Sequence, residues 1–193
     1  MRFDKIDITK SKQNDRLIRK EWLVEIILDF TLYLIFIGFL PLIAGSYFLE
    51  QLENGNHIFI ASILFGISLL IGGLLIYSII NLNRLRRISG TLKEKNRQSI
   101  KRLADKLDWT LQTHNQRITV LTLPWNWLST DWGRKITVIY DRQDILINIT
   151  SYGMHNIKSP FHWFENRKLV KKLIDNFEKE IKNDTPTIYK NNA

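Results

Sequence analysis

The sequence contains no cysteine. This absence excludes disulfide bonds, thiolate chemistry and the zinc or iron–sulfur sites that depend on cysteine ligands. It is also compatible with a reducing compartment. A cleavable signal peptide is not indicated, because the first 20 residues are polar and the apolar run that follows lacks a small-residue cleavage pattern.

Recognisable catalytic and cofactor motifs are missing as well. The sequence has no Walker A loop, no G-x-G-x-x-G and no G-x-S-x-G. Its four histidines show no H-x-x-x-H or H-E-x-x-H spacing, so we expect no metal site. Asp141 and Asp144 flank a turn, where Asp is favoured for backbone reasons. We therefore expect no catalytic residue, no cofactor and a protein that is not an enzyme.

Two long apolar runs dominate the first half of the sequence. No charge occurs in the nineteen residues from Phe30 to Phe48 or in the twenty-three from Ile58 to Ile80. About 20 helical residues cross a bilayer core of about 30 Å, and in lipid the backbone must satisfy its own hydrogen bonds. The sequence predicts a transmembrane hairpin over 22–82, with helices at about 26–49 and 58–80.

The basic residues predict the orientation of this hairpin. Lysine and arginine are frequent before the first run and after the second, whereas the connector has none. Short basic flanks stay in the cytoplasm. We expect a cell (inner) membrane protein with a cytoplasmic N-terminal segment, 1–21, and a basic juxtamembrane linker, 83–98. Three arginines of this linker are expected to contact anionic lipid: Arg84, Arg86 and Arg87.

Some polar and small residues inside the hairpin suggest assembly. Glu25 and Asp29 are four residues apart and share a helix face near the inner leaflet. They either pair with basic groups in the headgroup zone or form a polar contact inside an oligomer. The second helix holds two small-xxx-small pairs, which allow close approach within the hairpin or between protomers: Ser62/Gly66 and Ser68/Gly72.

The second half predicts a small cytoplasmic α+β domain over 99–183. An amphipathic helix around Ile100–Leu107 precedes four strand-like runs, the last two joined by the polar turn 141–144. Phe161–Phe164 adds an edge strand or only caps the core. A final helix follows, with Asn166 as its N-cap. The expected order is α-β-β-β-β-α, an antiparallel sheet with helices on one face, followed by a polar tail, 184–193.

A tryptophan-rich segment is the most unusual feature of this domain. It contains Trp125, Trp127 and Trp132, followed by Arg134 and Lys135. The tryptophans pack under the sheet, or form a surface that docks on a membrane or partner, or line a pocket. In the third case the rings stack on a base while Arg134 and Lys135 bind phosphates, as for a nucleotide.

The net charge of +9 does not by itself indicate which kind of partner the protein binds. Most of the basic excess lies on the two membrane flanks, where the orientation rule already explains it. Genomic nucleic acid is therefore not the expected ligand.

The layout of two helices and a small cytoplasmic domain is similar to that of several small bacterial membrane proteins. They include immunity proteins and membrane-disrupting effectors of anti-phage signalling. The likeness transfers no residue roles. Our first hypothesis is a non-enzymatic protein whose domain binds a partner and acts through an oligomerising hairpin. A nucleotide-gated effector that permeabilises the bilayer is the alternative, and a membrane-tethered enzyme is the third.

Overall fold

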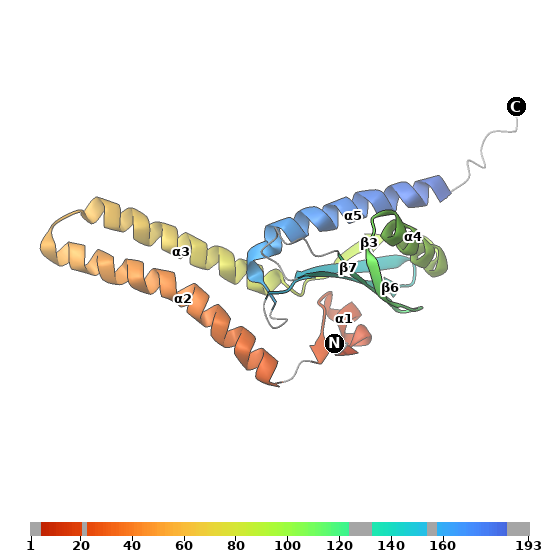
Figure 1. Cartoon of the computed structure of the whole chain (residues 1–193), viewed down its shortest axis with the longest axis horizontal. Helices are drawn as coiled ribbons and strands as arrows, with labels where there is room; N and C mark the ends of the chain where they lie inside the picture. Colours follow the sequence, from red (N-terminus) through yellow and green to blue (C-terminus); the bar gives the residue numbers. More distant parts are fainter. Residues whose placement is uncertain (1–4, 21–22, 124–132, 154–157, 185–193) are drawn as a thin grey trace, which may run out of the picture. The chain divides into compact units, whose positions relative to one another are not determined.

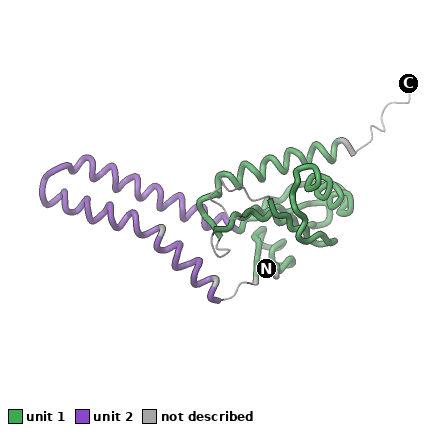
Figure 2. Tube along the Cα trace, in the orientation of Figure 1, with its two compact units in different colours: residues 1–20, 83–193 green, residues 21–82 purple. Residues whose placement is uncertain are grey.

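The chain forms two compact units. The computed structural model describes residues 5–20, 23–123, 133–153 and 158–184. One unit comprises residues 21–82, and the other comprises residues 1–20 together with 83–193 (Figure 2). The second unit is thus built from sequence on both sides of the first.

Residues 21–82 contain two long antiparallel helices, as the apolar runs predict (Figure 1). Helix α2 spans Leu23–Asn54 and helix α3 spans Ile58–Asn81. The turn after α2 uses Gly55 at a φ of 71°, a conformation that glycine adopts without strain. Helix α2 extends past the predicted end at 49, because its polar last residues continue the helical hydrogen bonding. The Gly55 N–H, for example, donates to the Gln51 carbonyl at 3.0 Å.

One stripe of α3 packs against α2. The stripe consists of small and apolar residues that are buried: Ala61, Ser68, Gly72, Leu75 and Ser78. A Cβ added at Gly72 would lie 3.6 Å from the Ile37 carbonyl oxygen, so the two helices approach closely at this point. Phe48 and Phe65 stack with ring centres 5.6 Å apart. Small residues therefore serve packing within the hairpin.

The remaining surface of these helices is apolar. Apart from Leu92, Phe161 and Phe164, every exposed large apolar side chain in the described part of the chain lies on α2 or α3. The two apolar segments have mean hydropathies of 2.4 and 2.6. By length and composition, both helices are able to cross a membrane.

The other unit contains a five-stranded antiparallel sheet. Its strand order is β3-β7-β6-β5-β4. The strands are β3 (Arg86–Ser89), β4 (Thr110–His114), β5 (Ile118–Thr122), β6 (Arg134–Asp141) and β7 (Asp144–Ser151). Two helices accompany it, α4 (Lys93–Lys106) and α5 (Trp163–Asp184), with a 3-10 turn, η2 (Pro160–His162), before α5.

The predicted order α-β-β-β-β-α is wrong, because a strand precedes α4. The segment predicted as a linker, 83–98, contains the edge strand β3 and the first turns of α4. Strand β3 pairs with β7, with Ile88 opposite Ile145. It has a single apolar residue among four, so it lacks the alternation by which a strand is recognised. An edge strand needs only one neighbour, and this one is some sixty residues away in the sequence.

The start of α5 also differs from the prediction. Phe161–Phe164 does not form an edge strand, because the chain turns through η2 and continues as helix from Trp163. Asn166 is not the N-cap. It is buried inside α5, where its Oδ1 accepts a hydrogen bond from Ser151 Oγ at 3.0 Å. Pro160 at the first position of η2 explains the earlier start, since its fixed φ suits a helical first turn.

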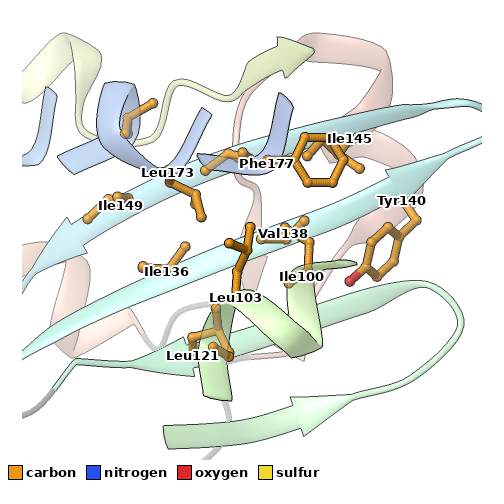
Figure 3. Packing of buried hydrophobic residues seen from close by; sticks show 13 residues of the cluster. Ile100, Leu103, Leu121, Ile136, Val138, Tyr140, Ile145, Ile149, Leu173 and Phe177 are labelled. Atoms are coloured by element: carbon orange, nitrogen blue, oxygen red, sulfur yellow. The ribbon is translucent and has the colours of Figure 1, made fainter. Parts of the chain in front are cut away.

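The main core lies between one face of the sheet and the helices α4 and α5 (Figure 3). Alternate residues of β6 and β7 point into it, and Phe177 and Leu173 of α5 and Ile100 of α4 meet them there. The prediction of an antiparallel sheet is confirmed, and α4 and α5 share one of its faces, but the sheet does not carry helices on that face alone, because α1 lies on the other. The two-residue period of β6 and β7 places Ile136, Val138, Ile145 and Ile147 on this face, whereas Ile139 and Leu146 are buried on the other.

The opposite face of the sheet is covered by the N-terminal segment, which the sequence did not predict. This segment forms β1 (Lys5–Ile6), α1 (Ile8–Asn14) and β2 (Arg19–Lys20), in which β1 pairs with β2. A second buried cluster holds it to the sheet: Leu17, Leu85, Ile118, Ile139 and Leu146.

Asn96 of α4 provides a stability test of this fold. Its Oδ1 accepts from the Thr91 N–H at 2.8 Å, and its Nδ2 donates to the Gln143 carbonyl at 2.9 Å. Asn96 is buried, and Asn96→Ala removes both hydrogen bonds and leaves the partly buried Thr91 N–H without this acceptor, so we expect unfolding to become easier by about 1–3 kcal/mol. Chemical denaturation in detergent measures this loss. Gln98→Ala, at an exposed position of the same helix, is the control. Equal effects of the two substitutions would contradict the assigned role.

Candidate functional site

The sequence on the two sides of the hairpin is joined by backbone hydrogen bonds. The Leu17 N–H donates to the Asn83 carbonyl at 2.6 Å, and the Leu85 N–H donates to the Asp15 carbonyl at 2.8 Å. Arg16 and Arg84 form a β-bridge between these bonds. We call residues 15–17 and 83–85 the flank junction. It places the segment before α2 and the segment after α3 in one folded structure.

Arg87 reinforces the junction with side-chain contacts. Its Nη1 donates to Asp141 at 2.9 Å and to Asp144 at 3.2 Å, and its Nη2 donates to Asp15 at 3.1 Å. Lys12 Nζ lies 3.2 Å from the second oxygen of Asp141. These five residues form the Arg87 network. Each pair is partly exposed and contributes on the order of 0–1 kcal/mol, so the network fixes geometry more than it adds stability.

The charges of Arg87 and Asp141 are stable at neutral pH. The hydrogen bond from Arg87 is the largest cause that lowers the pKa of Asp141, with Lys12 adding to it against a smaller opposing effect of burial. The hydrogen bond to Asp141 likewise raises the pKa of Arg87. A general acid or base works best with a pKa near the operating pH. The network is therefore better suited to binding than to proton transfer.

A solvent-open cavity of about 850 Å³ lies beside the network. Its walls come from α1, from Arg87 of β3, from the start of α4 and from the turns between β4 and β5 and between β6 and β7. Five of its lining side chains are cationic and two are acidic: Lys12, Lys93, Arg87, Arg117, Arg142, Asp141 and Asp144. The lining carries a net charge of +3, which favours an anionic ligand.

No protein-family model, curated protein or solved structure matches this chain. Each residue role proposed below therefore depends on this chain's own geometry.

The tryptophans of the predicted ligand pocket, Trp125, Trp127 and Trp132, lie outside the described residues. The two basic residues after them begin β6, at the end opposite the cavity. Arg134 forms an ion pair with Glu165 of α5. Lys135 Nζ lies 4.9 Å from the ring centre of Tyr152. The pocket at this end of the sheet stays a prediction.

The two predicted small-residue pairs of α3 lie in different surroundings. Ser68 and Gly72 are buried against α2. Ser62 and Gly66 are exposed, and a Cβ added at Gly66 would meet nothing within 4 Å. The first pair serves the hairpin itself, whereas the second is available for contact with another helix.

The structure bears only in part on the acidic pair of α2 and on the predicted lipid contacts. Asp29 is half-buried and has an interaction partner, while the side chain of Glu25 lies outside the described part. Arg84, Arg86 and Arg87 are all exposed. Arg87 is engaged by the three aspartates of its network, and lipid contact by these arginines stays a prediction.

Sequence reasoning missed most of the cavity. Arg117, Arg142 and Lys93 were not singled out, and Asp141 and Asp144 were read only as turn residues. Their side chains converge through pairings of distant segments. A weak signal existed in the apolar positions Ile6, Ile8 and Leu17, which stand isolated in a polar segment and now lie in or against the second buried cluster.

A second polar cluster lies inside the domain, away from the cavity. His114 Nδ1 is 2.9 Å from Thr119 Oγ1, which is 2.8 Å from Tyr140 Oη. Burial raises the pKa of Tyr140 to about 12. Burial also is the main cause that lowers the pKa of His114, and the charges of Arg97 and Lys101 add to it against Glu94 and Asp105. Among the described residues no group of three or more acidic or histidine side chains could hold a metal.

His114 gives the domain a pH dependence. Its pKa is lower in the folded state than the ordinary 6.5, so its stabilising effect is complete above 6.5 and is lost as the pH falls through the folded value. We expect the thermal midpoint to fall between pH 7 and pH 5 and the fall to be smaller in His114→Gln, which keeps a hydrogen-bonding group. Thermal scans at a series of pH values measure this. The same pH slope in both proteins would be a contrary result.

Proposed function

We propose that this chain is a non-enzymatic, two-pass protein of the cell membrane, whose cytoplasmic domain binds a partner and acts through a self-associating hairpin. Both termini are cytoplasmic in this proposal. The flank junction carries it, because both flanks of the hairpin belong to one folded domain. The distribution of basic residues supports the cytoplasmic side.

The junction couples the domain to the hairpin through the chain itself. Leu17 lies six residues before the start of α2, and Asn83 lies two residues after the end of α3. A change in how the N-terminal segment lies on the sheet therefore alters both chain segments that enter the membrane. Transmission between sites requires an element with two arrangements that both sites influence, and in this proposal the junction is that element.

The outward face of α3 supports self-association. Ser62 and Gly66 place small side chains on a surface that α2 does not cover. Small residues let helix backbones approach closely in lipid, where van der Waals packing drives association.

A pair of cysteine variants tests self-association in the membrane. Gly66→Cys places a thiol on the outward face, whereas Gly72→Cys places it against α2. Because the chain has no other cysteine, oxidation should give a disulfide-linked dimer for Gly66→Cys and little or none for Gly72→Cys. Non-reducing gels of membranes measure this. If Gly66→Cys and Ser62→Cys both stay monomeric at native expression, the self-associating hairpin is excluded.

A further inference from the structure

The cavity beside α1 has more positive charge than its own acids neutralise. Asp141 and Asp144 are paired with Arg87 and Lys12. Lys93, Arg117 and Arg142 also line the cavity, and within the described part of the chain their side chains have no ion pair or hydrogen bond. Three cations thus face one cavity with their donor groups unused.

The turn that carries Arg142 is held rigidly. Its neighbour Gln143 accepts hydrogen bonds at its carbonyl from the Gly90 N–H at 3.0 Å and from the buried Asn96 side chain at 2.9 Å. Arg142 itself has a φ of 56°, which is unfavourable for a long side chain. Strained positions of this kind are concentrated at binding sites. The cation is therefore presented from a fixed backbone.

The lining also indicates the chemistry of the ligand. Among the described residues that line it there is no aromatic ring and a single aliphatic side chain, Ile8. A nucleobase would find no aromatic ring of the described lining to stack on, whereas arginine and lysine recognise phosphate oxygens by charge-assisted hydrogen bonds.

We propose that Lys93, Arg117 and Arg142 bind a ligand that carries two or more phosphate groups, and that the phosphates rather than a base are recognised. Lys12 and Arg87 complete the positive wall. Such a ligand bridges α1, which precedes the hairpin, and β3, which follows it. It thereby strengthens the flank junction; this last step depends on the proposed function, whereas the binding itself does not.

Calorimetry on the full chain in nanodiscs of zwitterionic lipid tests the binding. Inorganic triphosphate and ATP should bind with similar affinity, while sulfate at equal ionic strength should give no saturable heat. Nanodiscs that contain a phosphorylated inositol lipid identify the source of the phosphates. If triphosphate no longer binds in nanodiscs with the inositol lipid, the natural ligand is a lipid headgroup. If triphosphate binding is unchanged there, the natural ligand is a soluble molecule. No saturable heat from triphosphate, combined with no effect of the inositol lipid on the thermal midpoint, overturns the proposal.

Two variants separate binding from folding. Arg142→Gly removes the cation and suits the φ of 56°, so the thermal midpoint should be retained or raised while the affinity falls. Together with Arg117→Gln the loss should reach about tenfold or more. Lys101→Gln and Lys171→Gln, at exposed positions outside the cavity, are the matched controls and should bind normally. Normal affinity in the double variant would place the anion elsewhere.

The link to the hairpin has a separate readout. Triphosphate should change the yield of crosslinked dimer when Gly66→Cys is the only substitution. It should not change this yield when Gly66→Cys is combined with Arg117→Gln and Arg142→Gly. Binding without any change in crosslinking supports the site and refutes the coupling. Crosslinking that responds to triphosphate in both backgrounds refutes the site.

Discussion

Leu17→Asp is expected to release the N-terminal segment from the sheet. Leu17 is 2% exposed and lies in the second buried cluster with Leu85, Ile118 and Ile139. Loss of a buried leucine side chain alone costs about 2–5 kcal/mol, and an unpaired buried carboxylate adds to this. The flank junction is built on the same residues, so its hydrogen bonds should be lost together with the contact.

Limited proteolysis in nanodiscs measures the release. Trypsin should cleave after Lys10, Lys12 or Arg16 much faster in Leu17→Asp than in the unchanged protein. Gln13→Asp, an acidic substitution at an exposed position of α1, is the control. The main core lies on the other face of the sheet, so amide exchange of β6 should change less than that of α1. Equal cleavage of all three proteins would show that Leu17 does not hold the segment.

Single-cysteine labelling should give an all-or-none result for the topology. The chain has no cysteine, so each introduced thiol reports one position. An impermeant maleimide should label Asn56→Cys, in the connector between α2 and α3, on intact cells. It should label Asn14→Cys and Gln116→Cys only after the membrane is opened. All three positions are exposed.

The labelling experiment tests the flank junction as well as the orientation. Asn14 precedes the hairpin and Gln116 follows it, yet both belong to the unit that the junction closes. They must therefore behave alike. Opposite labelling of these two positions would contradict the junction as well as the two-pass topology, whereas labelling of both from outside would reverse the orientation only.

The sequence predicted the elements whose signal is local. Uncharged runs of sufficient length indicate the two helices without reference to the rest of the chain. The alternation in β6 and β7 indicates which residues face the core. The final helix was likewise predicted, and its residues Leu173 and Phe177 pack into the main core.

Elements without a local signal were missed. Strand β3 has one apolar residue in four, and α1 is short and polar. Both elements are held by contacts with segments far along the chain. Such contacts cannot be seen in the composition of the element itself. The N-terminal segment and the basic linker that the charges suggested instead contribute β1, α1, β2 and β3 to the folded unit.

The candidate site depended even more on long-range contacts. Lys12 meets Asp141 across 129 positions of the sequence, and Arg87 meets Asp144 across 57. The interpretation of Asp141 and Asp144 as turn residues was correct for the backbone, since they form the last pair of the β6–β7 hairpin. Their charges gained a further role only when β3 and α1 were placed beside them.

For the hairpin, therefore, the sequence alone indicated two helices long and apolar enough to cross a membrane, because length and apolarity are properties of each run by itself. The tertiary structure decided that the two flanks of the hairpin close into one domain and that five cations gather around one cavity. Those facts depend on which distant segments pair, and pairing is selected by the packing of the whole sheet rather than by any single run of residues.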